Sequence, residues 1–410
     1  MTGAAKASRT AIWFIFITVF IDMAGFGLIM PVLPKLIEEV GHTDIGGASI
    51  MGGWLFLAYG GMQFLAGPAL GNLSDAHGRR PLLLLAVGGL VVDYIIMAFA
   101  PSMFWLFVGR TIAGLCGASY VIANAYLADI TAPEDRARVF GYMGAAFGLG
   151  FVIGPAIGGL LGELGSRVPF FAAAAFSLLN FCIGCFGVPE TLKAENRRAF
   201  EWRRANPIGT LMVFRNYKGM IPLAATMFLY FLATSVYPAI WAFWGIAAFG
   251  WSESTIGLTL AFFGLCMAIV QGAGTGPVVK WLGERGTVIF GLTIAAFTAL
   301  GYGLAPNFAV VMVLLVVHSP EGFVHPALTA IMSHAAPADA QGELQGGIAS
   351  LQNLAMVIGT LFFAQVFGYF LQPTAPVIST GMAFYVSSAL VVVTIIGVLM
   401  FTKNERPTPP

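Results

Sequence analysis

Two long apolar runs enclose a short polar segment, Gly71-Asn72-Leu73-Ser74-Asp75-Ala76-His77-Gly78-Arg79-Arg80-Pro81. Only 10% of the 410 residues are charged, so an Asp and two Arg this close together are unusual. A weaker copy lies 205 residues later, where Gly276 and Gly283 repeat the spacing of Gly71 and Gly78, and Glu284-Arg285 follows as Arg79-Arg80 did. This offset is half the chain length and indicates a duplicated molecule.

Composition places the chain in a membrane. Hydrophobic residues make up 58% of it and the mean hydropathy is +0.85, whereas soluble domains have about 45–50% apolar residues. A net charge of +1 gives no electrostatic case for binding nucleic acid. All four cysteines lie in apolar runs, which predicts inert buried thiols rather than metal or redox chemistry. The first run carries Asp22 and is too long for a signal peptide, so we interpret it as a mature helix.

The apolar runs predict an all-α membrane protein with twelve transmembrane helices, because each run has about the 20 residues that span a bilayer. Val152-Ile153-Gly154 recurs as Val357-Ile358-Gly359, again 205 residues on, and Gly141 recurs as Gly346. We therefore expect two pseudo-symmetric six-helix bundles, 1–188 and 219–410, joined by a linker at 189–218, with the substrate site at their interface. The expected spans are 11–33, 50–70, 82–100, 103–126, 139–162, 168–188, 219–245, 255–275, 286–305, 308–333, 343–370 and 378–401.

Basic residues give the orientation, since Lys and Arg concentrate in cytoplasmic loops. With the N-terminus inside, 17 of the 20 Lys and Arg residues face the cytoplasm, and the C-terminus is also cytoplasmic. Lys35 and Arg167 face outward, and Arg110 lies within a span. The linker holds seven basic and three acidic residues, and part of it could lie as an amphipathic helix on the anionic inner leaflet, or it could be a plain solvated segment.

Glycine and proline form a pattern, G-x8-G-x3-GP-x2-GG, in the span at 139–162. Small residues four apart allow close helix approach, and Pro155 predicts a bend. Ordinary packing and a role in gating both account for the pattern. Its members are Gly141, Gly150, Gly154, Pro155, Gly158 and Gly159.

Charges within spans are few, and such residues are generally functional. Asp93 and Arg110 are nearly equidistant from the turn at Pro101-Ser102, so they should lie at similar depth on antiparallel neighbours. They form either a structural ion pair or, with Asp22, a proton-responsive network.

A second group lies in the span at 308–333, where His318, Glu321 and His325 fall on one helical face. Proton transfer, substrate contact, a satisfied polar core and a metal site are all compatible with it, although zinc normally has three or four ligands.

Uncharged polar and aromatic residues within the spans suit an amphipathic ligand, which needs an apolar cavity with sparse polar groups. Any one of them could instead pack or face lipid. The candidates for substrate binding are Tyr59, Gln63, Asn124, Phe231, Trp241, Gln271, Gln352 and Asn353. A P-loop, GxSxG and HExxH are missing from the sequence, so we expect neither an enzyme nor a cofactor, and the energy should come from an ion gradient.

These motifs resemble the major facilitator superfamily. GNLSDAHGRRP is similar to its loop 2–3 signature, the glycine pattern at 141–159 to that of its drug:proton antiporters, and Asp22 to Pro34 and Gly109-Arg110-x3-Gly114 to its signatures in helices one and four. Over most of the chain the resemblance is greatest to the tetracycline efflux proteins of Gram-negative bacteria, as in Asp93-Tyr94, Pro169-Phe170-Phe171 and Gln341-Gly342-x-Leu344-Gln345-Gly346.

The resemblance implies a bacterial inner-membrane protein in which Asp75, Arg79, Arg80 and Asp129 form a cytoplasmic charge cluster that latches the two halves. It assigns proton and drug handling to Asp22, Gln63, Asp93 and Arg110. Two positions depart from the tetracycline pattern, because Met267 and Ala295 align where a His and an Asp are expected.

The sequence thus predicts a proton-coupled exporter of amphipathic or hydrophobic small molecules that works by alternating access. Its expected partners are the substrate, protons and membrane lipids, and we expect a monomer. Alternatives are a lipid or lysolipid carrier of the same fold and a non-transporting membrane sensor or scaffold.

Overall fold

The computed structural model describes residues 3–117, 119–201, 206–217, 219–337 and 340–402, and within these ranges all regular secondary structure is helical. Contacts divide the chain into two compact units. Unit 1 comprises Met1–His42, Leu55–Pro207 and Ser252–Ala261; unit 2 comprises Thr43–Trp54, Ile208–Trp251 and Phe262–Pro410. Five of the basic residues used for the orientation lie outside the described residues: Arg203, Arg204, Lys218, Lys403 and Arg406.

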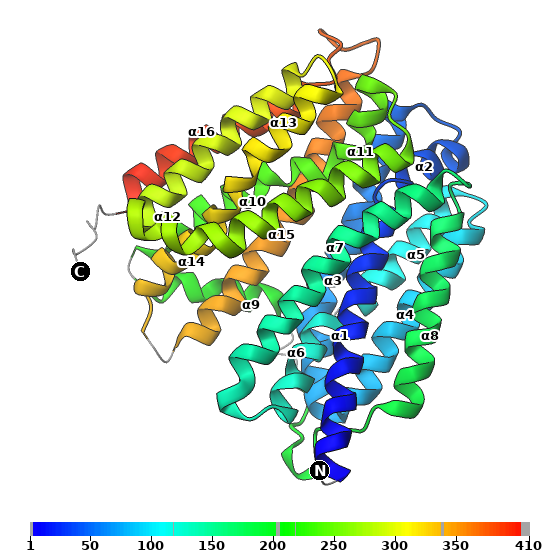
Figure 1. Ribbon diagram of the computed structural model, residues 1–410, viewed down its shortest axis with the longest axis vertical. Coiled ribbons are helices and arrows are strands. Elements are labelled where there is room, and N and C mark those ends of the chain that lie inside the picture. Colours follow the sequence, from blue (N-terminus) through cyan, green and yellow to red (C-terminus); the bar gives the residue numbers. More distant parts are fainter. Residues whose placement is uncertain (1–2, 118, 202–205, 218, 338–339, 403–410) are drawn as a thin grey trace. The chain divides into compact units, whose positions relative to one another are not determined.

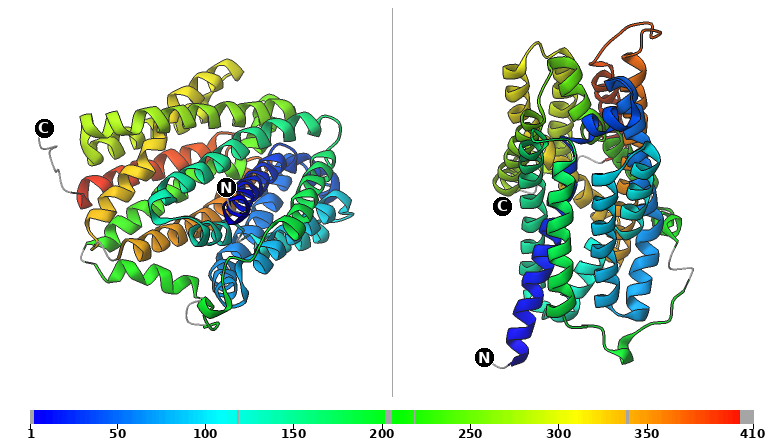
Figure 2. Two further views of the ribbon diagram at one scale, coloured as in Figure 1. Left: turned by 60° about the horizontal axis from the view of Figure 1, so that its bottom comes forward. Right: turned by 90° about the vertical axis from the view of Figure 1, so that its right-hand side faces the viewer.

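Unit 1 is built mainly from α1 to α8, with α1 packed along α7 and α8, and α4 packed against α5 and α8 (Figures 1 and 2). Its core includes Ile15, Leu83 and Tyr126. The bounds are α1 Gly3–Ile29, α2 Leu33–Gly41, α3 Ile45–His77, α4 Arg79–Phe99, α5 Met103–Cys116, α6 Ser119–Ile130, α7 Arg136–Gly162 and α8 Val168–Gly187, with 3-10 turns η1 Pro133–Asp135 and η2 Ala194–Asn196.

Unit 2 contains the remaining helices except the start of α12, which belongs to unit 1, with α10 and α11 packed against α15, and α10 also against α16. Its core includes Met227, Val324 and Leu328. The bounds are α9 Pro207–Leu211, α10 Met220–Thr234, α11 Val236–Phe249, α12 Glu253–Leu304, α13 Phe308–His318, α14 Val324–His334, α15 Gln341–Phe370 and α16 Met382–Phe401, with 3-10 turns η3 Met212–Arg215 and η4 Ser319–Phe323.

Ten helical stretches in the described part of the chain are long and apolar enough to cross a membrane. The twelve expected spans agree with them once α12 is counted as two helices, which meet at Gly283, and α3 is added. Large apolar side chains lie on the outside, as with Phe186 and Trp281, which are 93% and 80% exposed. Apolar surface of this kind is suited to lipid rather than water, so the all-α membrane fold is confirmed.

The duplication inferred from sequence is visible in the backbone. Gly78 separates α3 from α4 with φ 111°, and Gly283 separates the two parts of α12 with φ 70°. Positive φ is a conformation that glycine adopts without steric cost. The two copies of the polar segment therefore end in the same kind of turn.

The glycine pattern lies where α7 crosses α1. A Cβ added at Gly150, Gly154 or Gly158 would come within 2.7 Å of a backbone oxygen of α1, so the two backbones are in direct contact there. A Cβ on Gly257 of α12 would lie 2.1 Å from the carbonyl oxygen of Pro155. Only glycine permits these crossings. α7 continues as a helix through Pro155.

In the described part of the linker the helical segments are short: the turn η2, and the five-residue α9 followed directly by η3. An amphipathic segment on the inner leaflet stays a prediction. Residues before α9 lie on unit 1: the Arg198 amide donates to the Asp75 carbonyl at 3.0 Å, and the Asn72 side chain donates to the Glu201 carbonyl at 2.7 Å. Hydrogen bonds to unit 1 thus hold this segment, which lacks the regular hydrogen bonds of a helix.

Candidate functional site

Asp93 of α4 and Arg110 of α5 form a buried ion pair in unit 1. The Asp93 side chain is fully buried and that of Arg110 is 9% exposed. The predicted adjacency on antiparallel neighbours is confirmed, because α4 ends at Phe99 and α5 begins at Met103 after a short turn. Each residue also keeps one atom, Oδ1 of Asp93 and Nε of Arg110, without a hydrogen bond in the described structure. Breaking such a pair would leave an uncompensated buried charge.

Asp22 of α1 lies on the same cavity but outside this ion pair. It is 8% exposed, and neither carboxylate oxygen makes a hydrogen bond with standard geometry in the described structure; Ser119 is the polar side chain beside it. Asp22, Asp93 and Arg110 all line a cavity of about 50 Å³. A cavity needs about 10–15 Å³ to hold one water, so this one has room to hydrate the carboxylate. The three residues predicted as a network therefore share a cavity, with only two of them in direct contact.

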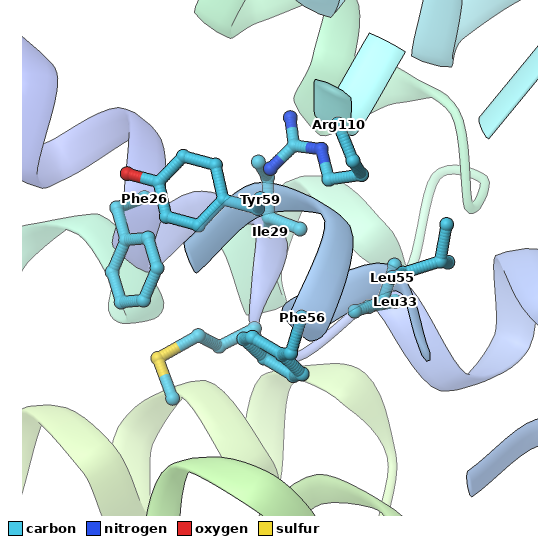
Figure 3. A pocket seen from close by; sticks show the side chains of 8 residues that line it. Phe26, Ile29, Leu33, Leu55, Phe56, Tyr59 and Arg110 are labelled. Atoms are coloured by element: carbon cyan, nitrogen blue, oxygen red, sulfur yellow. The ribbon is translucent and has the colours of Figure 1, made fainter. Parts of the chain in front are cut away.

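An apolar pocket adjoins this polar cavity and shares Phe26, Ile29, Tyr59 and Arg110 with it. The Tyr59 ring lies between Phe26, at 6.2 Å between ring centroids, and the Arg110 guanidinium, at 5.7 Å from the Tyr59 centroid (Figure 3). The apolar pocket has a volume of about 20 Å³ and ends at the Arg110 guanidinium, so apolar and charged side chains lie next to each other, as the lining of a site for an amphipathic ligand requires. The rest of its lining is Met30, Leu33, Leu55 and Phe56.

The candidates for substrate binding are divided between the units. In unit 1, Tyr59 and Gln63 line the polar cavity, and Gln63 Nε2 donates to the Gly117 carbonyl at 2.9 Å. Asn124 instead donates to the Tyr120 carbonyl within α6, at 3.1 Å. In unit 2, Trp241 is 4% exposed in an aromatic cluster with Trp244, Trp251 and Tyr302, Phe231 is also buried, and on α15 Gln352 is half-buried and Asn353 exposed.

His318, Glu321 and His325 lie on one continuous helical stretch, Phe308–His334, whose middle turn η4 is a 3-10 helix. The three side chains have different nearest neighbours. His318 packs on Tyr237, Phe263 and Tyr302, whereas Tyr230 donates a hydrogen bond to Glu321, and His325 lies 5.5 Å from the Phe231 ring. The described residues hold no group of three or more His, Cys, Asp or Glu placed to bind a metal.

The polar segment at the α3–α4 turn forms a charge cluster around Arg79. Its guanidinium contacts Asp75 at 2.5 Å, Asp129 at 3.1 Å and the Ser74 hydroxyl at 2.8 Å. Arg80 differs from expectation, since its guanidinium donates to the Cys185 carbonyl at 2.6 Å and not to a carboxylate. Gly71, by contrast, packs loosely, with Val121 3.9 Å from where its Cβ would be.

Glu190 is a residue of this cluster that the sequence reasoning missed. Its carboxylate accepts from the backbone amides of Arg79 at 2.9 Å and Arg80 at 3.2 Å, at the first turn of α4. Helix N-termini have free amides and favour an anion. The available signal was an acidic residue directly after the apolar span that ends at 188, but nothing in the sequence paired it with α4.

A second missed group joins the start of α12 to α2 and α7 in unit 1. Lys35 Nζ lies 2.9 Å from Glu253 Oε1, and the Ser254 hydroxyl donates to Glu163. The Glu253 carboxylate raises the pKa of Lys35 above its ordinary value. Hydrogen bonds from Ser254 and then Ser252 lower the pKa of Glu163 below its ordinary value. Both shifts favour the charged forms that make these contacts.

Comparison with known proteins agrees with this architecture. The profile of the Major Facilitator Superfamily matches residues 15–360 and 223–410. The chain is 42% identical to the class C tetracycline resistance protein of Escherichia coli over 366 residues, covering 88% of this chain and 90% of that protein. It is 38% identical to the class G protein of Vibrio anguillarum, with 85% and 88% covered, and 34% identical to the class B protein of Escherichia coli, with 85% and 86% covered.

Solved structures show the same fold. The crystal structure of a human organic anion transporter, MFSD10, superposes with a TM-score of 0.69 at 24% identity, covering 95% of this chain and 99% of that one. The nucleoside transporter NupG superposes with a TM-score of 0.77 at 12% identity, covering 96% of this chain and all of that one. Together with the twelve spans, the repeated polar segment and the glycine crossing, these matches establish that the chain belongs to the Major Facilitator Superfamily.

Proposed function

We propose that this protein exports amphipathic, tetracycline-like small molecules in exchange for protons, by alternating access. The observation that carries the proposal is the pair of adjoining cavities in unit 1, one lined by Asp22, Asp93 and Arg110 and the other apolar. The relatives named as tetracycline resistance proteins support drug export rather than the lipid-carrier alternative. The proposed setting is the bacterial inner membrane, with both termini cytoplasmic.

Asp22 is the proposed proton-exchanging group. Burying an ionised carboxylate without a partner is costly, so its protonation would depend on what else occupies the cavity. Arg110, by contrast, already compensates Asp93. A substrate entering from the apolar side would contact Tyr59 and Arg110 and disturb that pair, which would link substrate binding to the charge of Asp93 and, through the shared cavity, to Asp22.

Gating is proposed for the Arg79 cluster and the α7 crossing. Arg79, held between Asp75 and Asp129, would fix the α3–α4 turn in one arrangement, and Gly154 and Pro155 would let α7 move against its neighbours. We further propose that 1–188 and 219–410 act as the two halves, joined by 189–218, and that the working form is a monomer.

The test is pH-driven tetracycline transport by the purified protein in proteoliposomes, with Asp22→Asn and Asp93→Asn variants. Removing the titratable carboxylate should abolish the accumulation of tetracycline that a pH gradient drives, because proton movement is then no longer coupled to substrate movement. Substrate counterflow without a gradient should persist in Asp22→Asn, which shows that the carrier still moves. Gradient-driven accumulation at the unmodified rate in both variants would refute the proton assignment.

A further inference from the structure

The turn at Gly283 in α12 can be compared position by position with the turn at Gly78, because the two glycines lie 205 residues apart. Residues related by this offset are repeat-equivalent. Both glycines have a positive φ and are followed directly by a helix. The neighbouring helices correspond as well, since α6 begins at Ser119 and α14 at Val324, again 205 residues on. The two units therefore build this region from equivalent elements.

An ion pair joins these elements in each unit, and its signs are reversed. In unit 1, Arg79 at the start of α4 pairs with Asp129 near the end of α6, at 3.1 Å. In unit 2, Oε2 of Glu284, the residue after Gly283, lies 3.5 Å from Nδ1 of His334, the last residue of α14. Both members follow their counterparts in unit 1 by 205 residues. The contact is thus repeated, while the basic and the acidic residue exchange places.

The third charge of the cluster is reversed as well. Asp75 lies one turn before Arg79 and pairs with it at 2.5 Å. Its repeat-equivalent is Lys280, an exposed residue one turn before Glu284. Coulomb attraction depends on the product of two charges, so exchanging every sign leaves it unchanged. Decay of a copied motif would instead lose charges singly, which indicates that the cluster in unit 2 has a use of its own.

The reversed signs suit the helix ends at which they lie. Helix N-termini favour an anion and C-termini a cation, so Glu284 at a helix start and His334 at a helix end are both well placed. In unit 1 the opposite charges occupy these positions, and Glu190 supplies the anion at the start of α4. The repeat-equivalent of Glu190 is Ile395, because Glu284 already supplies the anion in unit 2.

His334 sets this copy apart, because histidine is the side chain whose charge changes between about pH 5 and 8. Arginine and aspartate stay charged over this range, whereas an imidazole ring attracts Glu284 only when it is protonated. The His334 side chain is 65% exposed, so protons from solvent reach it directly. The ion pair of unit 2 is therefore present at acidic pH and is lost as the pH rises.

The other charged and titratable groups around the pair are few. Glu284 is the acidic residue within ion-pair distance of His334 in the described part of the chain. The Arg285 guanidinium is directed to the Leu399 carbonyl of α16, at 3.0 Å. The remaining such groups on α14 and the elements around it are Tyr230 on α10, Lys280 on α12, Glu321 in η4, His325 on α14, and Glu343 and Tyr369 on α15. A change in the charge of His334 therefore acts mainly on Glu284.

We propose that His334 and Glu284 form a pH-sensitive latch in unit 2, which closes when His334 is protonated, fixes the turn at Gly283 and slows the transport cycle. The proposal rests on the proposed efflux function and adds its regulation. His334 acts by positioning the turn and does not contact substrate. In the proposed topology the pair lies on the cytoplasmic side, where an antiporter releases the protons that enter in exchange for substrate. Acidification of the cytoplasm would thus slow further proton entry.

The test is exchange of labelled tetracycline across proteoliposomes that hold the full-length protein, with equal pH on both sides, at about pH 5.5 and at about pH 8. Each variant's rate is divided by the wild-type rate at the same pH, which removes effects of pH on the drug and on other groups. His334→Gln should be about two- to fivefold faster than the wild type at the acidic pH, the size expected for an exposed ion pair, and equal to it at the alkaline pH. His334→Arg, which stays charged, should equal the wild type at the acidic pH and be slower by a similar factor at the alkaline pH.

Glu284→Gln should behave as His334→Gln does, because it removes the other member of the pair. His42→Asn removes a different exposed histidine, in the turn after α2, and should match the wild type at both pH values. Rate ratios of His334→Gln and His334→Arg that are the same at both pH values would overturn the proposal, and so would ratios that change in the opposite direction.

Amide hydrogen exchange tests the latch without transport. Relative to an unfolded peptide at the same pH, the residues after Gly283 should be better protected at about pH 5.5 than at about pH 8 in the wild type, and equally protected at both in His334→Arg. Protection that falls alike with rising pH in the two proteins would count against the latch. Failure of the efflux function would appear separately, as loss of pH-driven tetracycline transport by the wild type in proteoliposomes.

Discussion

At the scale of single residues, the two buried carboxylates of unit 1 differ in the groups that surround them. Asp93 has Arg110, whereas Asp22 has a cavity and the nearby Ser119 hydroxyl. The Asp93–Arg110 pair therefore contributes to the structure as well as to the site. This dual role can be tested by replacing Arg110 alone and then Asp93 and Arg110 together.

Arg110→Met should destabilise the protein by about 3–5 kcal/mol, because it leaves Asp93 buried without a counter-charge. The double variant Asp93→Asn with Arg110→Met should recover much of the loss, since no uncompensated charge then remains. Thermal unfolding in detergent, followed by tryptophan fluorescence, measures both effects. Equal destabilisation by the single and double variants would show that the ion pair does not contribute to the stability of the protein.

Glu190→Ala should loosen the α3–α4 turn. The carboxylate accepts from the backbone amides of Arg79 and Arg80 and from those of Thr191 and Leu192, and loss of a capping side chain costs about 0.5–2 kcal/mol. Limited proteolysis should cut the variant faster than the wild type between α3 and α4. Glu195→Ala provides the control, and equal protection in the two variants would count against the capping role of Glu190.

At the scale of elements, close helix crossings and helix breaks recur in both units. Gly154 on α7 and its repeat-equivalent Gly359 on α15 both lie where an added Cβ would come within 2.5 Å of a neighbour, while Gly141 and Gly346 both face open space. The repeat thus preserves which glycines are packed and which are free. Tight packing follows from position on the helix and not from glycine content.

Gly154→Ala should therefore destabilise the protein although alanine is the better helix former. The new Cβ would meet the backbone of Ala24, 2.5 Å from its carbonyl oxygen, and backbone atoms cannot move aside as a side-chain end can. Overpacking of this kind costs about 1–3 kcal/mol, whereas Gly141→Ala should be neutral or gain up to about 1 kcal/mol. Thermal unfolding of the two variants side by side checks the expectation, and a stabilised Gly154→Ala protein would contradict it.

At the scale of the whole molecule, each compact unit includes a short segment from the other half of the sequence. Ser252–Ala261 belongs to unit 1, where Lys35 and Glu163 hold it, and Thr43–Trp54 belongs to unit 2, where Ser49 donates to the Ala364 carbonyl at 3.2 Å. Such exchanged segments couple parts of the chain that are distant in sequence.

The attachment of Ser252–Ala261 should depend on pH in a defined direction. Because the folded pKa of Glu163 lies below its ordinary value of 4.5, its contribution is present above that pH and is lost as the pH falls through the folded value. Lys35 has a raised pKa, so its contribution is present below its ordinary value of 10.5 and is lost only at higher pH. The protection of the segment against hydrogen exchange, relative to an unfolded peptide at the same pH, should fall below about pH 4.5 and stay high at neutral pH.

Ser254→Ala is the matched variant for this test. Without its hydroxyl, exchange of the segment should be faster at neutral pH as well, and the pKa of Glu163 should move back toward its ordinary value. Exchange that is the same in both proteins at every pH would show that the Glu163 contact does not hold the segment.

The sequence by itself determined the membrane spans, the repeat and the Asp93–Arg110 pair. Each depends on information that is local along the chain: about 20 consecutive apolar residues make a span, and a short turn between antiparallel helices places residues 93 and 110 at one depth. The special backbone at Gly78 and Gly283 was likewise encoded by glycine at the same offset.

The tertiary structure alone decided the 3-10 turn at Ser319–Phe323, the role of Glu190, the Lys35–Glu253 and Ser254–Glu163 contacts, and the hydrogen bonds from Gln63 to Gly117 and from Gln271 to Gly322. All of these depend on side chains that meet a backbone group or a charge more than 50 positions away, or on a neighbour that compensates lost helical hydrogen bonds. A hydrophobic pattern specifies which face of a helix is buried, but not which remote polar atom it meets there.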